Sequence, residues 1–346
     1  MLEELPESLD ETYERVLREI NKANRAHAHR LLQCLTVAIR PLRVAELAEV
    51  LAVDLEAASG EETSKLRTDW RWEDQEQAVL STCSSLITIV NASGSQVVQF
   101  SHFSVKEFLT SPRLVASSSD VSRFHILLEP AHTTMARACL GTLLRLDRIS
   151  EDSVMDQFPL ARYAAEHWVT HAQFEAVSSY IREGMKILFD AKKPYFSAWI
   201  WIYDIDVKPR HGLTFWYFST KMSDAGPIYY AALCGFHDLV EHLINGRSQE
   251  VNTIGGFYVS PLVAALAMEH FEVAELLYQH GAHIDVQGYY KCTPLYVASR
   301  EGHLEFAQWL LRHGADIGAE NVQGMTPLDA AWAGDMAKLL SDYGPK

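Results

Sequence analysis

Two histidines, His167 and His171, are spaced four residues apart on an expected helix, and their side chains could together bind a metal ion. The glutamate that a zinc protease would use precedes His167 and does not lie between the two histidines, and no third ligand is evident in the sequence. We therefore expect both imidazoles to pack against other helices or to face solvent, and we predict no metal site.

Nucleophilic side chains show no catalytic pattern either. Cys34 and Cys83 lie in apolar helical contexts, which is typical of core thiols. Ser84, Ser85 and the run 117–119 have no nearby His/Asp arrangement. Because the sequence also contains no Gly-x-x-x-x-Gly-Lys-Ser/Thr loop, it offers no phosphate cradle. We predict no catalytic residue and no cofactor, although an enzyme with an unrecognised site stays an alternative.

The elements that position these residues are clearest near the C-terminus, where a motif recurs. Four segments begin at prolines 34, 33 and 33 residues apart, and an alanine follows each proline by four residues. The prolines are Pro227, Pro261, Pro294 and Pro327. Proline suits the first turn of a helix, and a preceding Ser or Thr can cap it. Two segments end in His-Gly-Ala, where Gly281 and Gly314 favour the left-handed conformation that ends a helix.

The period, the Thr-Pro-Leu motif, the alanine and the Gly-Ala ending together resemble the ankyrin repeat. This resemblance implies about four stacked helix pairs over residues 224–346, the last of them short. The sequence departs from the family where a histidine usually follows Thr-Pro-Leu, because Tyr229, Val263, Tyr296 and Asp329 occupy that position. The hydrogen bonds that this histidine normally makes must be replaced or missing.

The hairpin tips between the expected repeats are the best candidates for binding. They carry Phe257, Tyr258, Tyr289, Tyr290, Asn321 and Gln323. Exposed tyrosines on successive tips would supply rigid amphipathic anchors of the kind that dominate protein interfaces. The alternative is that these rings pack between neighbouring tips. We predict that the concave, hairpin-tip face binds a protein partner.

The N-terminal part reads as helices followed by a β-hairpin, the order of a winged helix. Helices are expected at residues 9–24, 26–39, 44–53 and 73–84, strands at 86–90 and 96–100, and a further helix from residue 102. A winged helix can bind DNA, so a DNA-associated regulator is the alternative function. The expected recognition helix, however, holds Glu73, Asp74 and Glu76 and no basic residue, which disfavours contact with phosphates.

Three stretches of this part, 5–13, 40–47 and 100–109, look like fungal signal-transduction ATPases of the STAND class with a NACHT domain. A fourth, 158–168, resembles the helical spacer of that family. The resemblance implies a winged-helix domain over 1–112, a helical spacer over 113–222 and then the repeats, within a signalling or innate-immunity-like protein. The family's ATPase activity is not carried over, because the phosphate-binding loop is missing. An ATPase domain of a longer parent protein is the partner that the resemblance implies.

An aromatic-rich segment lies near the end of the expected spacer. It contains Tyr195, Phe196, Trp199, Trp201, Tyr203 and then Phe215, Trp216, Tyr217 and Phe218. We expect it to cover the open end of the first repeat, which a solenoid requires. A ligand groove at the junction of spacer and repeats is the alternative.

Composition and charge narrow the classes of partner. The net charge of −15 disfavours nucleic acids and anionic membranes, and the longest apolar stretch, 195–203, is too short to span a bilayer. Five scattered cysteines without a Cys-x-x-Cys pair suit a reducing compartment. The first twenty residues contain no apolar signal core. We expect a mainly α protein of the cytoplasm or nucleus.

Overall fold

The N-terminal part forms a winged helix in the computed structural model, which describes residues 9–55, 65–83, 85–92, 94–117, 119–146, 156–206, 225–246, 251–331 and 334–344. Its elements are α2 (Arg25–Val37), β1 (Leu42–Arg43), α3 (Val44–Leu51), α4 (Gln75–Cys83), β4 (Ile87–Ala92) and β5 (Ser95–Phe100). The predicted hairpin is present, with Ile89 opposite Val98. The sequence did not predict β1, which pairs antiparallel with β5 to give the order β1-β5-β4.

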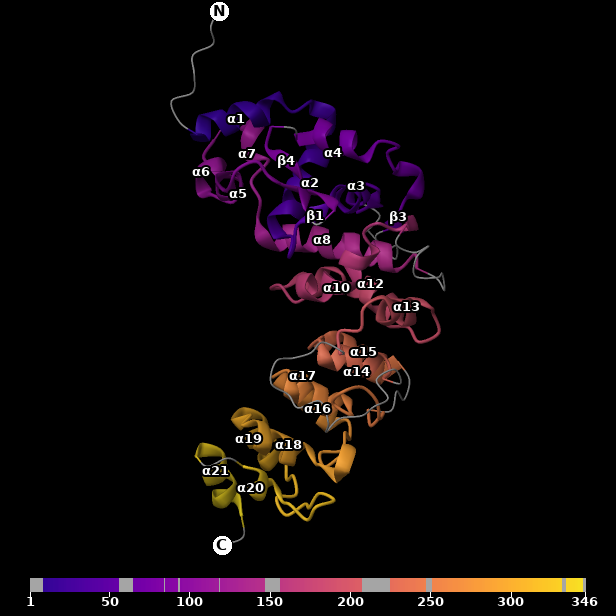
Figure 1. The fold of residues 1–346 in the computed structure, drawn as a ribbon, viewed down its shortest axis with the longest axis vertical. Helices are drawn as coiled ribbons and strands as arrows, with labels where there is room; N and C mark the ends of the chain where they lie inside the picture. Colours follow the sequence, from indigo (N-terminus) through magenta and orange to yellow (C-terminus); the bar gives the residue numbers. More distant parts are fainter. Residues whose placement is uncertain are drawn as a thin grey trace, which may run out of the picture. The chain divides into compact units, whose positions relative to one another are not determined.

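The chain divides into two compact units, Met1–Tyr203 and Asp204–Lys346, and Figure 1 colours them along the sequence. The first unit also contains α1 (Leu9–Glu19), η1 (Lys22–Asn24), β2 (Val53–Asp54), β3 (Lys65–Leu66), η2 (Thr68–Trp70), α5 (Phe103–Leu109), α6 (Pro112–Val115), α7 (Ser119–Ser122), α8 (Leu128–Leu143), α10 (Ala161–Ala172), α11 (Val177–Tyr180), α12 (Arg182–Leu188) and α13 (Tyr195–Ile202). No helix in the described part of the chain has the length and apolar character needed to cross a bilayer.

Helix α8 holds the first unit together because it packs against both α2 and α10. The fully buried Leu31 and Cys34 of α2 and Met135 and Cys139 of α8 contribute to this core. Burial raises the pKa of the Cys34 thiol to about 12, so this cysteine is an inert core residue. The side chain of Cys83 lies outside the described residues. The expected winged helix and spacer thus share one core, and their division at residue 112 stays a prediction.

The first part of the aromatic segment, α13, completes the core of the first unit. Trp199 of α13 packs edge-on against Trp168 with ring centroids 5.2 Å apart, and lies 5.6 Å from Phe189. Its indole Nε1 donates a hydrogen bond to the Ala165 carbonyl at 3.0 Å. Residues 215–218 lie outside the described residues, so the expected cover over the first repeat stays a prediction.

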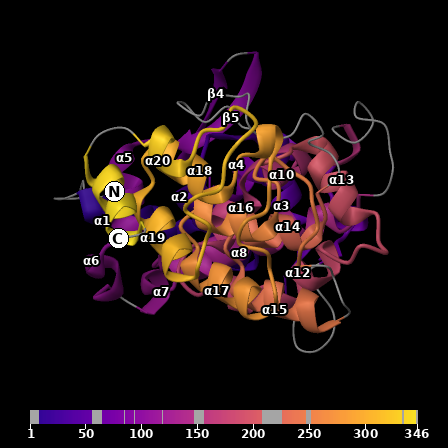
Figure 2. The same ribbon diagram turned by 90° about the horizontal axis from the view of Figure 1, so that it is seen from below.

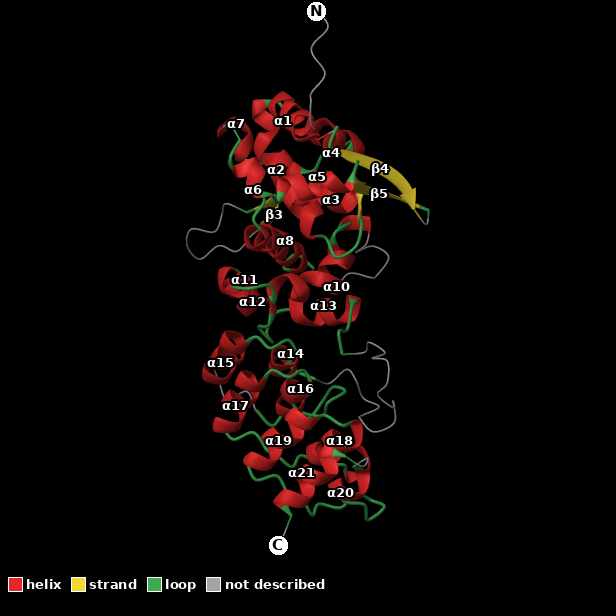
Figure 3. Ribbon diagram, turned by 90° about the vertical axis from the view of Figure 1, so that its left-hand side faces the viewer, coloured by secondary structure: helices red, strands yellow, loops and turns green. Residues whose placement is uncertain are grey.

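The second unit consists of four described helix pairs, as the repeat predicted. The helices are α14 (Pro227–Leu233), α15 (His237–Gly246), α16 (Pro261–Ala267), α17 (Phe271–Gln279), α18 (Pro294–Glu301), α19 (Leu304–Arg312), α20 (Pro327–Ala330) and α21 (Asp335–Tyr343), with a single turn η3 (Tyr289–Lys291) before α18. In Figure 2, α14, α16 and α18 form one row and α15, α17 and α19 form a second row beside it. Figure 3 shows that strands are confined to the first unit among the described residues.

The repeat motif acts as the sequence predicted. Ser260, Thr293 and Thr326 accept hydrogen bonds from the backbone of the first helical turn, and a proline follows each of them. Gly281 and Gly314 adopt φ of +87° and +88°, the left-handed conformation that ends a helix. The alanines of the first three inner helices, Ala231, Ala265 and Ala298, are fully buried, which lets neighbouring helices approach closely.

Candidate functional site

Two adjacent hairpin tips present apolar side chains to solvent. Tyr290 is 47% exposed and Val322 on the next tip is 54% exposed. The Val322 N–H donates a hydrogen bond to the Tyr290 carbonyl at 2.9 Å, so the two tips are tied together through their backbones. Gln323 is also exposed. This arrangement can present a continuous surface to a protein partner.

The other predicted tip residues are not equally accessible. The expectation of an exposed ring is wrong for Tyr258, which is only 5% exposed because it packs edge-on against Phe257 at 5.0 Å. Asn321 is also buried, since its Oδ1 accepts hydrogen bonds from the backbone of Gln323 and Met325. Phe257 is half-buried, and the side chain of Tyr289 lies outside the described residues.

The tip that carries Tyr290 has a strained backbone. Tyr290 and Lys291 both have φ of +57°, a conformation that costs a non-glycine residue about 1 kcal/mol or more. Lys291 stands three residues before its repeat proline, and glycine, Gly324 with φ of +75°, fills that position in the next tip. Both strained side chains are exposed.

A buried carboxylate joins the first hairpin to the start of the second unit. Asp206, 8% exposed, accepts hydrogen bonds from the Tyr229 hydroxyl at 2.9 and 3.0 Å and from the Phe257 N–H at 2.5 Å. The Tyr229 oxygen in turn accepts the Tyr258 N–H at 3.0 Å. We call these four residues the Asp206 clasp. Tyr229, which stands where the family usually has a histidine, thereby bonds to the backbone of the next hairpin.

A second, more open contact lies beside the clasp. The Tyr230 hydroxyl donates to Asp204 Oδ1 at 2.7 Å, and the Asp206 N–H donates to the same oxygen at 2.9 Å. Burial raises the pKa of Asp204, and the hydrogen bond from Tyr230 offsets only part of that rise. Burial also raises the pKa of Tyr229, with the Asp206 charge adding to it, so this hydroxyl stays a donor.

Gly256 makes room for the clasp. It has φ of +71°, and a Cβ at this position would overlap the Tyr229 ring. The larger tyrosine in place of the family histidine therefore requires a residue without a side chain on the facing hairpin.

The face of the winged helix that could meet DNA is acidic. A groove beside the start of α4 and the β-hairpin is lined by Arg43, Val44, Ala45, Glu73, Asp74, Gln75, Glu76, Ser95 and Gln96. The carboxylate of Asp74 accepts the Gln77 N–H at 2.9 Å and so caps α4. The guanidinium of Arg43 pairs with Glu46 at 2.9 Å. This geometry gives the DNA-associated alternative no support.

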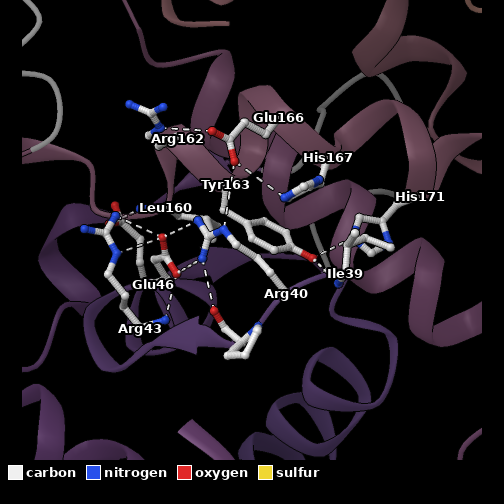
Figure 4. A network of polar contacts seen from close by, with 12 residues as sticks. Ile39, Arg40, Arg43, Glu46, Leu160, Arg162, Tyr163, Glu166, His167 and His171 are labelled. Atoms are coloured by element: carbon white, nitrogen blue, oxygen red, sulfur yellow. Dashed lines mark hydrogen bonds and ion pairs between the residues drawn. The ribbon is translucent and has the colours of Figure 1, made fainter. Parts of the chain in front are cut away.

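A cluster of ionisable groups lies in the first unit, around Glu46 of α3 (Figure 4). Both oxygens of this fully buried carboxylate accept the Arg40 guanidinium at 2.8 Å, and Oε2 also accepts the Arg43 N–H at 2.7 Å. Burial alone would raise the pKa of Glu46, but the hydrogen bonds and charges of the two arginines outweigh it and lower the pKa. Glu46 is therefore a saturated structural anion.

His171 belongs to the same region, and both of its ring nitrogens lie within hydrogen-bond distance of protein side chains. Its Nε2 lies 2.9 Å from the Tyr163 hydroxyl, and its Nδ1 lies 2.9 Å from Nδ1 of His132. Burial, with smaller contributions from His132 and His167, lowers the pKa of His171 to about 3. No group of three or more metal-binding side chains gathers among the described residues. His171 thus packs against a neighbouring helix, as one of the two sequence-based expectations for it stated.

The sequence did not predict these clusters because the residues that contact one another are distant in the chain. One local signal was available: Glu46 interrupts the apolar helix Val44–Leu51 and follows two arginines by six and three residues. A buried acid among nearby arginines is the pattern of an ion pair. Nothing comparable marks Asp206, whose partners lie 23 and 51 residues away.

Comparison with known proteins supports both parts of the fold. Residues 13–121 match the family described as the winged-helix domain of GPI inositol-deacylase. Residues 228–321 and 291–346 match the family of ankyrin repeats in three copies. Ankyrin repeats are non-catalytic protein-interaction modules.

A curated relative covers most of the chain. It is the azaphilone pigments biosynthesis cluster protein L of Monascus ruber, 32% identical over 297 residues. The match covers 80% of this chain, and the chain spans 60% of the length of that relative.

Proposed function

We propose that this chain is a non-catalytic recognition module that binds a protein partner through its ankyrin hairpin tips. The observation that carries the proposal is the pair of exposed apolar side chains, Tyr290 and Val322, on hydrogen-bonded neighbouring tips. Because the tips are preformed, association would order few groups and so would cost little entropy. The backbone strain at Tyr290 supports the same surface, since strain of this kind gathers at functional sites.

The proposal extends to a longer protein that would contain this chain. The winged helix and spacer would connect partner recognition to an ATPase domain of the NACHT/STAND type, in a cytoplasmic signalling protein. The matched winged-helix family and the resemblance of residues 5–13, 40–47 and 100–109 support this assignment. The saturated Glu46 network supports a structural role for the first unit's buried charges.

The test is a pull-down from source lysate with quantitative mass spectrometry, comparing the wild-type chain with Tyr290→Ala and Val322→Ser. A matched control is Tyr343→Ala, because Tyr343 on α21 is also 47% exposed. We expect a defined protein to be retained by wild type and Tyr343→Ala and reduced about tenfold or more by the tip variants. Equal retention by all four chains would place the interface elsewhere. Retention of no specific protein by the wild type would contradict the proposal for the isolated chain.

A further inference from the structure

The first hairpin tip is held by a side chain from outside the repeats. Asp206 precedes the first repeat in the sequence. Its carboxylate nevertheless accepts a hydrogen bond from the backbone N–H of Phe257 at 2.5 Å. The same carboxylate orients the Tyr229 hydroxyl, whose oxygen accepts the N–H of Tyr258 at 3.0 Å. Two consecutive amides of the tip therefore depend on one carboxylate.

The later tips are fixed by other means. Asn321, within its own hairpin, accepts the backbone N–H groups of Gln323 and Met325 at 2.8 and 3.0 Å. The backbone between the second and third tips is joined by the bond from Val322 to Tyr290. No such local amide acceptor is needed at the first tip while Asp206 fills this role. Loss of Asp206 would leave the buried Tyr229 hydroxyl and the half-buried Phe257 N–H without this acceptor, at a desolvation cost.

Asp206 also lies three residues beyond Tyr203, where the first compact unit ends. Residues 204–206 begin the second unit, and we call them the joining segment; through Asp206 this segment is bonded directly to the first tip. We propose that Asp206 is a positioning residue that couples the order of the first hairpin tip to the conformation of this joining segment. A displacement of the segment that withdraws Asp206 would release the tip, and a partner that fixes the tip would hold the segment in place.

The test is hydrogen exchange followed by mass spectrometry on the full chain without any partner. Asp206→Asn should raise exchange of peptides covering residues 251–260 about tenfold, because the amide group replaces one acceptor oxygen with a donor. Peptides covering residues 314–326 should be unchanged. Asp204→Asn is the matched control, since Asp204 bonds to Tyr230 and not to the tip.

Tyr229→Phe provides an independent variant that keeps the carboxylate, and Tyr230→Phe is its control. The first should expose the Tyr258 amide and the second should not. Unchanged exchange at 251–260 in both Asp206→Asn and Tyr229→Phe would overturn the proposal. Equal acceleration throughout residues 225–344 would also overturn it, because Asp206 would then act on global stability.

The consequence for partner binding rests on the proposed function of the tips. With a partner in hand, Asp206→Asn should weaken its affinity several-fold while Asp204→Asn leaves it unchanged. Failure to find a partner would contradict the proposed function while leaving the exchange result intact. Accelerated exchange without any change in affinity would overturn the coupling between the joining segment and recognition.

Discussion

Glu46 in the first unit and Asp206 in the second are both buried carboxylates, but their charges are compensated differently. Glu46 lies between the guanidinium groups of Arg40 and Arg43, so opposite charge offsets its desolvation. Asp206 receives neutral donors, the Tyr229 hydroxyl and the Phe257 N–H. A charge-paired network fixes a core strongly and leaves a charged remnant when broken. A carboxylate with neutral donors leaves only unsatisfied hydrogen bonds when it is lost.

The largest difference should appear when Glu46 is neutralised. Glu46→Gln presents an amide N–H₂ to two arginines and should lower the free energy of unfolding by about 3 kcal/mol. Urea unfolding, monitored by hydrogen exchange of peptides from the first unit, measures this loss. Glu166→Gln is the control, because Glu166 is more exposed and lies 3.9 Å from Arg40. A loss for Glu46→Gln no greater than that for Glu166→Gln would contradict the assigned role of the network.

The equivalent change in the second unit should cost less. Asp206→Asn retains one acceptor oxygen and leaves no unpaired guanidinium, so we expect a loss of about 2 kcal/mol confined to the second unit. The same urea experiment, read from peptides of residues 225–344, tests it. If Asp206→Asn proves more destabilising than Glu46→Gln, the proposed distinction between charged and neutral compensation is wrong.

Acidification should lower the stability of the first unit through its buried histidines. The pKa of His171 is about 3 in the folded chain, below the ordinary value of 6.5, so the unfolded state binds more protons between these values. The contribution of His171 to the free energy of unfolding of the first unit should therefore fall by about 1.4 kcal/mol per pH unit as the pH decreases through this window. His132, whose pKa burial also lowers, would act in the same direction.

The Asp204 contact should respond to acid in the opposite sense. Its pKa is raised above 3.8 by burial, so the folded state binds more protons in the window just above that value, and the burial cost of the Asp204 charge falls as the pH decreases. Unfolding midpoints of the first unit, and the difference between wild type and Asp204→Asn in the second unit, measured from pH 7 to pH 4, check both signs. His171→Gln should flatten the dependence in the first unit. An unchanged slope in this variant would assign the acid sensitivity to other groups.

The smallest effects should come from the outer contacts of each region. Arg43→Ala removes a half-exposed guanidinium but keeps the Arg43 N–H bond to Glu46, and Asp204→Asn keeps an acceptor for Tyr230. Each should cost about 1 kcal/mol or less. Thermal unfolding of both variants beside the wild type measures these losses. A larger loss in either case would show that the outer contact, not the buried carboxylate, dominates its region.

The local motifs of the repeats were predictable because each acts within a few residues. Pro261 begins a helix, Thr293 caps one and Gly314 ends one through backbone geometry that a short sequence specifies. The two-residue strand β1 was missed because it is too short to show an alternating pattern.

Side-chain partners across long separations were not predictable from one sequence. Tyr258 and Tyr290 both lie on hairpin tips, yet one ring is buried and the other exposed. The difference arises from the Phe257 ring and the Asp206 clasp, whose carboxylate lies about fifty residues upstream of the tip. Of the six residues predicted for the candidate surface, the structure shows exposed side chains for Tyr290 and Gln323, and it adds the exposed Val322.

The space that the Tyr229 ring occupies beside Gly256 restricts how this part of the sequence can evolve. A tyrosine at position 229 fits only opposite a glycine at position 256, and its hydroxyl is satisfied only with an acid at position 206. None of the three can change alone without steric overlap or an orphaned polar group. Among descendants of this chain, the three positions should therefore change together and not one at a time.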